Sequence, residues 1–267
     1  MQDDDAAVSL EAALARAESD VDAALKAAAT VASSLKTFRA AVHVGNLRDL
    51  GPAIAAAEQA LTGLRQQFAN AKEGWDLDED AYFANGFFSR ELLQTAQRMN
   101  VRIFEQDDRL YCYPALVRVL ADERCVLIDK KRERRLRPSV LVDHLRDLQR
   151  RLPRFKPEAF LEALYSGYTT IVAKRGKDLF GQGIVVKLLD VYDLLTLLPG
   201  QAREYSRQEF ARDIYLLDRS GVTATKRGYV VSLPASTGTR SPGSTVRVIT
   251  EQGEEKIYYG ISFTAAG

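Results

Sequence analysis

The chain has 267 residues, of which 46% are hydrophobic and 27% charged, and its formal net charge is +1. This balance is ordinary for a soluble globular protein. No apolar run approaches the roughly 20 residues of a membrane-spanning helix, and the start, with Asp3, Asp4 and Asp5, is unlike a signal peptide. We therefore expect a cytoplasmic protein without membrane contact.

The first stretch, from Val8 to about Val42, is rich in alanine and lacks proline and glycine, which predicts a long helix. Its apolar residues repeat every seven positions in two rows, as in a coiled-coil seam. One row is Leu14, Val21, Ala28, Leu35 and Val42; the other is Leu10, Ala17, Ala24, Val31 and Phe38. Gly45-Asn46 and Gly51-Pro52 bracket a break, with Pro52 suited to a new helix. The spacing continues after it through Ile54, Ala57, Leu61, Leu64, Phe68 and Ala71.

These features predict a coiled-coil-like antiparallel helical hairpin over residues 1–73. At about 1.5 Å per residue, the first arm would span roughly 50 Å and the second roughly 30 Å. The excess of the first arm needs cover, either from later helices of the same chain or from another chain. Residues 8–72 are therefore the candidate docking region for other protein subunits or for a second copy.

A small α+β domain is expected over residues 89–155, after an acidic, aromatic linker at 74–88. Four short apolar runs, VRIFE, RLYCYP, LVRVL and RCVLID, are separated by turns and predict an antiparallel meander. Helices are expected before it, from Ser89, and after it, from Ser139. Cys112 and Cys125 lie in these runs, and buried thiols are favoured over a disulfide.

The last part of the chain, residues 156–267, has the element order of a winged helix. Pro157 opens a helix, and Ser206 with Glu209 forms a capping box that starts another. Phe210, Ile214 and Leu217 predict one buried face of that helix. A short hairpin over 223–233 with a basic tip follows, and a final hairpin turns at Gln252-Gly253. The expected fold is α+β with a winged-helix-like C-terminal domain.

Charge is distributed unevenly along the chain. Residues 1–80 hold 7 Lys and Arg against 14 Asp and Glu, whereas residues 118–156 hold 13 against 6. The acidic and basic regions could attract each other or face different partners. The basic run could instead lie along the phosphates of duplex DNA. The candidate phosphate-binding residues are Lys130, Lys131, Arg132, Arg134, Arg135, Arg137, Arg150, Arg151, Lys226 and Arg227.

The helix at 206–219 carries candidates for base reading. Arg212 and Arg219 lie opposite its apolar stripe, where side chains could reach base edges in a major groove. The charges of this helix cancel, however, which argues against strong attraction to DNA by the helix alone.

One enzymatic alternative is a metal-dependent nuclease that uses Asp108, Asp129 and Lys131. Paired acids with a lysine could hold a metal ion and activate water, and Glu91 precedes them on a helix. The spacing resembles the loose pattern of restriction-type nucleases, except that Lys130 stands where an apolar residue is usual. His43 and His144 have no neighbours at ligand spacing, so no zinc site and no cofactor are predicted.

The sequence therefore favours a non-enzymatic subunit of a larger, bacterial-type assembly, either DNA-binding or an adaptor. In this interpretation the basic middle segment contacts phosphates and the helical hairpin docks partners. A purely structural oligomerisation protein is the further alternative.

Overall fold

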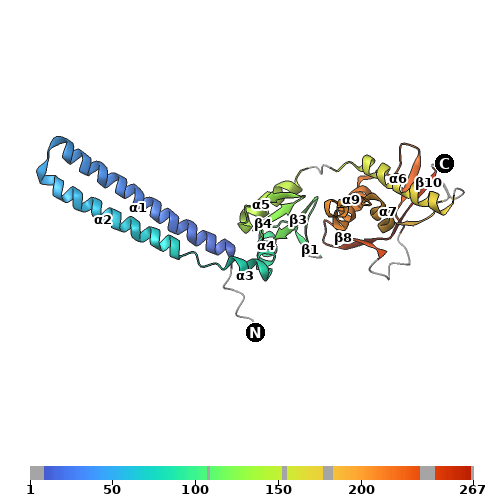
Figure 1. The fold of residues 1–267 in the computed structure, drawn as a ribbon, viewed down its shortest axis with the longest axis horizontal. Helices are drawn as coiled ribbons and strands as arrows, with labels where there is room; N and C mark the ends of the chain where they lie inside the picture. The colour runs from blue at the N-terminus through green and yellow to red at the C-terminus, as the bar shows by residue number, and fades with distance from the viewer. Residues whose placement is uncertain (1–8, 107–108, 152–154, 177–182, 235–243, 266–267) are drawn as a thin grey trace, which may run out of the picture. The chain divides into compact units, whose positions relative to one another are not determined.

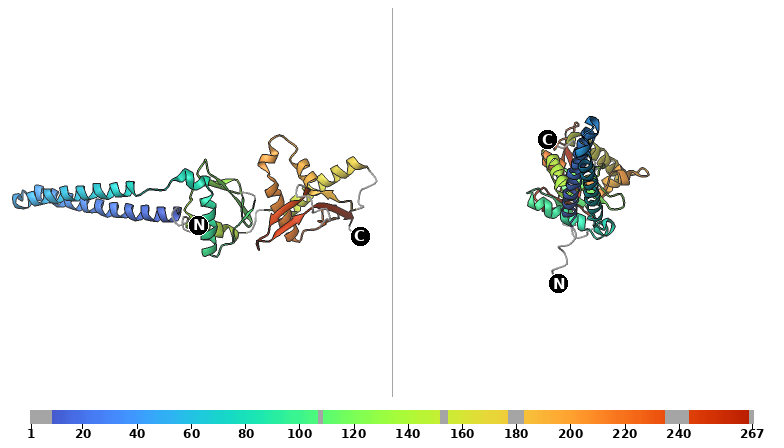
Figure 2. Two further views of the ribbon diagram at one scale, coloured as in Figure 1. Left: turned by 90° about the horizontal axis from the view of Figure 1, so that it is seen from below. Right: turned by 90° about the vertical axis from the view of Figure 1, so that its left-hand side faces the viewer.

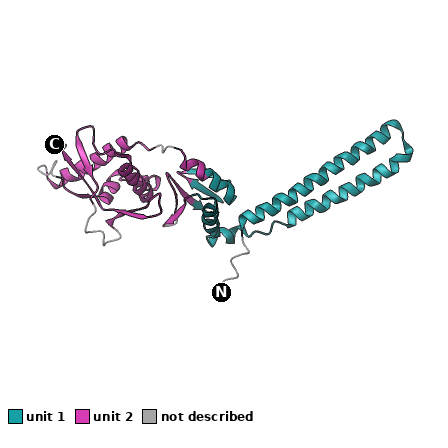
Figure 3. Cartoon of the chain, turned by 180° about the vertical axis from the view of Figure 1, so that it is seen from behind, with its two compact units in different colours: residues 1–101, 119–127, 131–144 teal, residues 102–118, 128–130, 145–267 magenta. Residues whose placement is uncertain are grey.

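The computed structural model describes residues 9–106, 109–151, 155–176, 183–234 and 244–265 (Figure 1). The fold is α+β: a long antiparallel helix pair precedes a five-stranded antiparallel meander, and further helices and small sheets follow. The chain forms two compact units, which Figure 3 colours separately. Unit 1 comprises residues 1–101, 119–127 and 131–144, and unit 2 comprises residues 102–118, 128–130 and 145–267.

The helix pair consists of α1 (Leu10–Val44) and α2 (Leu47–Glu73), which lie side by side in Figures 1 and 2. Gly45 ends α1 in the left-handed conformation, with φ of 69°. The Asn46 side chain then caps α2 by accepting the Asp49 N–H. None of the described helices is both long and apolar enough to cross a membrane.

The predicted hairpin is confirmed, but the predicted break at Gly51-Pro52 is wrong. Because Asn46 supplies a cap, α2 begins at Leu47 and Pro52 lies inside the helix, within its first two turns. A proline there removes only one helical hydrogen bond, close to the helix end where such bonds are fewest. The arms therefore have 35 and 27 residues, and the difference in length is smaller than predicted.

Two short helices, α3 (Glu79–Ala84) and α4 (Phe87–Arg98), follow, so the predicted linker contains a helix. Buried Glu91 of α4 caps the first turn of α1. Its carboxylate accepts hydrogen bonds from the Ser9 hydroxyl (2.6 Å) and from the backbone N–H of Leu10 (2.8 Å). It also accepts bonds from the Glu11 N–H (3.1 Å) and the Tyr82 hydroxyl. This cap fixes the start of the helix pair to the rest of unit 1.

The meander has the strand order β1-β2-β3-β4-β5. Its strands are β1 (Phe104–Gln106), β2 (Arg109–Cys112), β3 (Ala115–Leu120), β4 (Cys125–Ile128) and β5 (Lys131–Glu133). In the register, Tyr111 is opposite Phe104 on one side and Leu116 on the other. Both cysteines are free and buried, as predicted. The fifth strand, which was not predicted, is formed by the basic run, and α5 (Pro138–Gln149) follows it.

The rest of unit 2 consists of helices and two small sheets. The helices are α6 (Pro157–Arg175), α7 (Leu188–Leu195), α8 (Gln201–Glu204) and α9 (Arg207–Ser220). The strands are β6 (Val186–Lys187), β7 (Tyr229–Ser232), β8 (Val246–Ile249), β9 (Glu255–Tyr258) and β10 (Gly260–Ala265). They form a three-stranded sheet, β6-β10-β7, and a hairpin, β8-β9. The predicted capping box of α9 is present, and its Phe210, Ile214 and Leu217 are buried.

The hairpin predicted over 223–233 is reduced to a single bridge between Ala224 and Val230. Strand β7 instead pairs with β10, with Val231 opposite Phe263. The final β8-β9 hairpin is confirmed, and Val246 is buried. Its cross-strand partner is Tyr258.

Candidate interaction surfaces

The basic run begins in the turn between β4 and β5. Asp129 and Lys130 are the two residues of this turn, and both have positive φ, 45° and 72°. Two consecutive residues with positive φ are typical of a type I′ hairpin turn. The Asp-x-Lys triplet of the nuclease hypothesis therefore spans a tight hairpin turn and the start of β5.

Two arginines of the run are held by carboxylates of unit 1. Arg132 Nε lies 2.7 Å from Glu123 Oε2, and Arg135 Nη2 lies 2.6 Å from Glu133 Oε2. The hydrogen bond from Arg135 lowers the pKa of Glu133 to about 2. A guanidinium held in this way must leave its carboxylate before it can contact a phosphate.

Arg137 connects the basic run to the acidic first helix. Its Nε lies 2.7 Å from Glu11 Oε1 and its Nη1 lies 2.6 Å from Glu18 Oε2. The N–H and hydroxyl of Ser139 also donate to Glu11, at 2.8 and 2.9 Å. Burial opposes ionisation of Glu11, but the bonds from Arg137 and Ser139 outweigh it and lower the pKa of Glu11. At this point the basic middle contacts the chain's own acidic helix.

The remaining candidate cations differ in whether they contact a carboxylate or carbonyl oxygen. Lys130 Nζ contacts the Glu204 carbonyl and lies 3.5 Å from Glu209 Oε1. Arg150 lies at the limit of an ion pair, 4.0 Å from Asp147. Five further cations are exposed and form no ion pair with any described residue: Lys131, Arg134, Arg151, Lys226 and Arg227.

The predicted base-reading face of α9 packs against unit 2 itself. The Arg212 side chain is only 15% exposed, with Nη1 2.6 Å from Asp129 Oδ1 and Nη2 3.0 Å from Asp213 Oδ1. The Tyr205 hydroxyl donates to the other oxygen of Asp213 at 2.8 Å. Burial raises the pKa of Asp213 despite the adjacent guanidinium. Arg212 therefore belongs to a largely buried ion cluster.

Arg219, the second candidate for base reading on α9, also has contacts within the chain. It forms an ion pair with Glu251, and its guanidinium lies 5.9 Å from the Tyr215 ring centroid. Tyr215 is buried and packs edge-on against Tyr113, with ring centroids 5.2 Å apart. The α9 face opposite the apolar stripe is therefore mostly an internal contact.

The residues of the nuclease hypothesis do not form a carboxylate cluster in the part of the chain that is described. Asp129 Oδ1 accepts hydrogen bonds from Arg212 and from the Leu116 N–H, at 2.6 and 3.1 Å. Glu91 is the cap of α1, and Asp108 lies outside the described residues. Among the described residues, no three His, Cys, Asp or Glu side chains form a group that could hold a metal ion.

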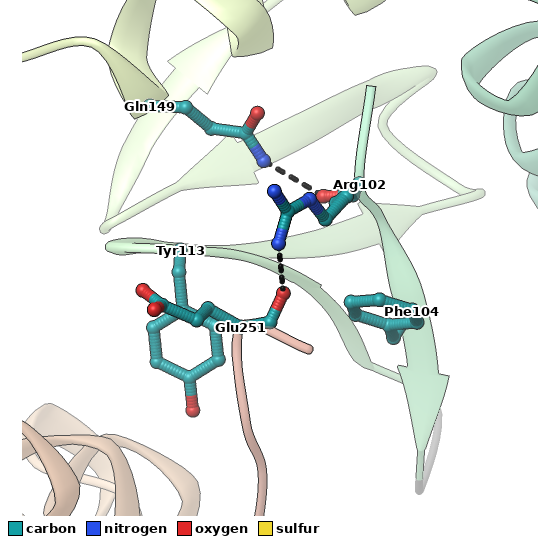
Figure 4. Close-up of a pocket in the computed structure, with 5 residues that line it drawn as sticks. All are labelled: Arg102, Phe104, Tyr113, Gln149 and Glu251. Atoms are coloured by element: carbon teal, nitrogen blue, oxygen red, sulfur yellow. Dashed lines mark hydrogen bonds between the residues drawn. The ribbon is translucent and has the colours of Figure 1, made fainter. Parts of the chain in front are cut away.

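A polar cavity of about 250 Å³ lies in unit 2 (Figure 4). Its lining residues are Arg102, Phe104, Tyr113, Gln149 and Glu251. Gln149 donates to the Arg102 carbonyl at 2.7 Å. The carboxylate of Glu251 is already paired with Arg219. A charged ligand would therefore compete with an existing ion pair, and we assign no ligand to this cavity.

The helix pair buries small residues and exposes larger ones. Of the two predicted rows on α1, the row that begins at Leu10 lies mostly in the interface, together with Ala13 and Ala41. The other row is largely outside it: Val21 is 50% exposed, Leu35 45% and Val42 56%. We call this row, with Leu14 and Ala28, the outer row of α1. The expectation that both rows form the seam is therefore wrong.

Helix α2 repeats this arrangement. Its buried residues are Ala53 and Ala57, whereas four larger residues at seven-residue spacing are exposed. These four form the outer row of α2: Leu47 (79% exposed), Ile54 (37%), Leu61 (40%) and Phe68 (66%). On each helix, the outer row lies four positions after a row that faces the other helix. The outer rows of α1 and α2 therefore occupy the same heptad position. In an antiparallel pair such positions flank the interface on the same side. The two outer rows therefore form one exposed apolar face, which no described residue covers.

Comparisons with models of protein families, with curated proteins and with solved structures found no match to this chain.

Proposed function

We propose that the chain is a non-enzymatic adaptor subunit that docks onto another helical protein surface through the apolar face of α1 and α2. The observation that carries this proposal is the exposure of both outer rows on one side of the pair. Scattered exposed apolar residues are normal, whereas contiguous apolar patches mark interaction sites. Seven of the exposed large hydrophobic residues in the described part of the chain belong to these two rows: Val21, Leu35, Val42, Leu47, Ile54, Leu61 and Phe68.

We further propose that residues 156–267 form a winged-helix-like domain used for packing against protein. The order α6, β6, α7, α9, β7 and β10, with α8 and the β8-β9 hairpin inserted, and the sheet order β6-β10-β7 support this proposal. The engagement of Arg212 and Tyr215 within unit 2 favours protein contact over base reading by α9.

The adaptor proposal can be tested by affinity purification of the tagged full-length chain from its native host. Leu61→Glu with Phe68→Glu places two charges in the apolar face. Gln59→Glu with Gln66→Glu is the matched control, because these exposed residues have the same spacing on the same helix but lie outside the row. At least one partner should be lost with the first variant and retained with the control. Identical partners for both variants and wild type would contradict the proposal.

A second candidate function is sequence-independent binding of duplex DNA through the exposed cations that form no ion pair with a described residue. It is favoured by the exposure of Lys131 and Arg134 beside the hairpin turn and of Lys226 and Arg227 elsewhere in the chain. Replacing these four residues by alanine should flatten the salt dependence of binding by about one unit per lost phosphate contact. Arg135→Ala is the control, because Arg135 is already held by Glu133. Fluorescence anisotropy against salt measures this, and no binding by wild type at low salt would exclude the function.

A further inference from the structure

The sizes of the buried and exposed side chains in the helix pair are unusual for an isolated hairpin. Small residues such as Ala13, Ala41, Ala53 and Ala57 occupy buried positions. The larger leucine, isoleucine, valine and phenylalanine side chains of the outer rows face solvent. A two-helix hairpin would bury more apolar surface with the two sets exchanged. Two apolar sides per helix are typical of a four-helix bundle, in which each helix contacts two neighbours.

The size of the apolar face fits a specific protein interface. From Val21 to Val42 the outer row of α1 extends about 33 Å at 1.5 Å per residue, and two adjacent helices are about 20 Å wide. The face is therefore about 650 Å² per copy, or about 1,300 Å² for two identical faces. Stable protein interfaces bury about 1,200–2,000 Å² in total.

The charges beside the apolar face favour a second copy of the same face. Five exposed charged residues occupy one heptad position next to the outer rows: Glu18 and Arg39 on α1, and Glu58, Arg65 and Lys72 on α2. Each helix carries its acid nearer the N-terminus and its base or bases nearer the C-terminus. The helices are antiparallel, and a Cβ on Gly74, the residue that follows α2, would lie 2.9 Å from Asp20 of α1. This contact shows which residues of the two helices lie at the same height along the pair.

Because of this arrangement, an acid on one helix lies near the level of a base on the other at each end of the pair. A two-fold axis along the pair would bring Glu18 toward Lys72 and Arg39 toward Glu58 of the other copy. A two-fold axis across the pair would bring Glu18 toward Arg39 and Glu58 toward Lys72, but it would also bring Arg65 toward Arg65 of the other copy. The axis along the pair is therefore favoured, because it places opposite charges together without a contact between like charges, although Glu18 also contacts Arg137 of its own chain. Such isologous, self-complementary contacts are the commonest form of dimer interface.

We propose that two copies of the chain pack their apolar faces together and form an antiparallel four-helix bundle from α1 and α2. This inference rests on the proposed adaptor function and names the partner of its docking surface. The bundle would cover both outer rows, and the charges along its edges would disfavour uncharged or uniformly acidic helical partners.

Size-exclusion chromatography with light scattering of the full-length chain, over a micromolar concentration series, tests the proposal. Wild type should reach twice the single-chain mass of 29.7 kDa. Leu61→Glu with Phe68→Glu should raise the dimer dissociation constant at least about 100-fold, because both residues are central apolar contacts. Gln59→Glu with Gln66→Glu should dimerise like wild type.

Circular dichroism at 222 nm controls for loss of helix in the charged variant. If that variant unfolds, Leu61→Ala with Phe68→Ala replaces it and should also weaken the dimer. A wild type that stays at single-chain mass at every concentration, or a folded face variant that still dimerises, would overturn the inference. A monomeric wild type whose other partners still depend on Leu61 and Phe68 would refute self-association and leave the adaptor function standing.

Discussion

Replacing Arg212 by alanine is the most direct test of whether this residue is structural or contacts DNA. The side chain is 15% exposed and lies between Asp129 and Asp213, of which Asp213 is itself only 12% exposed. Removing one partner of a buried ion pair leaves an uncompensated charge, which typically costs about 3–5 kcal/mol. Arg219→Ala on the same helix should cost less than about 1 kcal/mol, because Arg219 is 49% exposed in its pair with Glu251.

The decrease in the free energy of unfolding caused by Arg212→Ala should depend on pH. Burial raises the pKa of Asp213 in the folded protein above its ordinary value of 3.8. When folding raises the pKa of a carboxyl group, the free energy of unfolding decreases as the pH rises from the pKa of the unfolded state through the pKa of the folded state. Arg212 opposes this shift, so Arg212→Ala should raise the pKa of Asp213 further. The destabilisation relative to wild type should therefore be smallest below pH 3.8 and should grow above it.

Denaturant unfolding of both variants, followed by circular dichroism at several pH values, measures this effect, and anisotropy with duplex DNA provides the functional comparison. A loss below about 1 kcal/mol at neutral pH, together with weaker DNA binding, would show that Arg212 is a ligand contact and not a buried ion.

Two further substitutions test the contacts that shape the fold. Glu91→Ala should destabilise unit 1 by about 3 kcal/mol, because it removes a helix cap and leaves the Tyr82 hydroxyl without its acceptor. Ser9→Ala removes one donor to Glu91 and also the N-cap oxygen that accepts the Ala12 N–H, and it should cost about 1 kcal/mol. Thermal unfolding compares the two variants, and equal losses would refute the additional stabilisation by Glu91. Gly253→Ala should cost about 1–3 kcal/mol, because φ is +88° and the new Cβ would lie 2.5 Å from Phe104. Gly228→Ala has a similar positive φ but open space around it, and a loss as large as that of Gly253→Ala would exclude the clash with Phe104 as the cause.

The elements that sequence reasoning predicted well are those whose signals are local. The capping box of Ser206 and Glu209 placed the start of α9, and the spacing of Phe210, Ile214 and Leu217 identified its buried face. Heptad spacing identified the helix pair. It could not show which row is buried, because both rows have the same period and only the partner helix decides between them.

The predictions that failed depended on contacts between distant segments. Strand β7 was expected to pair within a short hairpin, whereas its partner β10 lies about thirty residues further along the chain. The surroundings of Arg212 were missed for the same reason, because Asp129 comes from the meander and is remote in sequence. Glu91 was considered as a metal ligand, and no local pattern indicates that its carboxylate caps a helix that begins at Leu10.

The anchoring contacts of α1 also define an order of events during synthesis. Helices α1 and α2 are joined by a two-residue turn, so they can pair as soon as residue 73 has left the ribosome. Glu91 becomes available to cap α1 only later, and Arg137 and Ser139, which bind Glu11, follow later still. The chain order therefore allows the hairpin to pair before it is attached to the rest of unit 1, because part of that attachment needs residues more than 120 positions downstream of Glu11. During that interval the apolar face is already complete on the nascent chain. Two neighbouring nascent chains could then associate through it before either chain has finished folding.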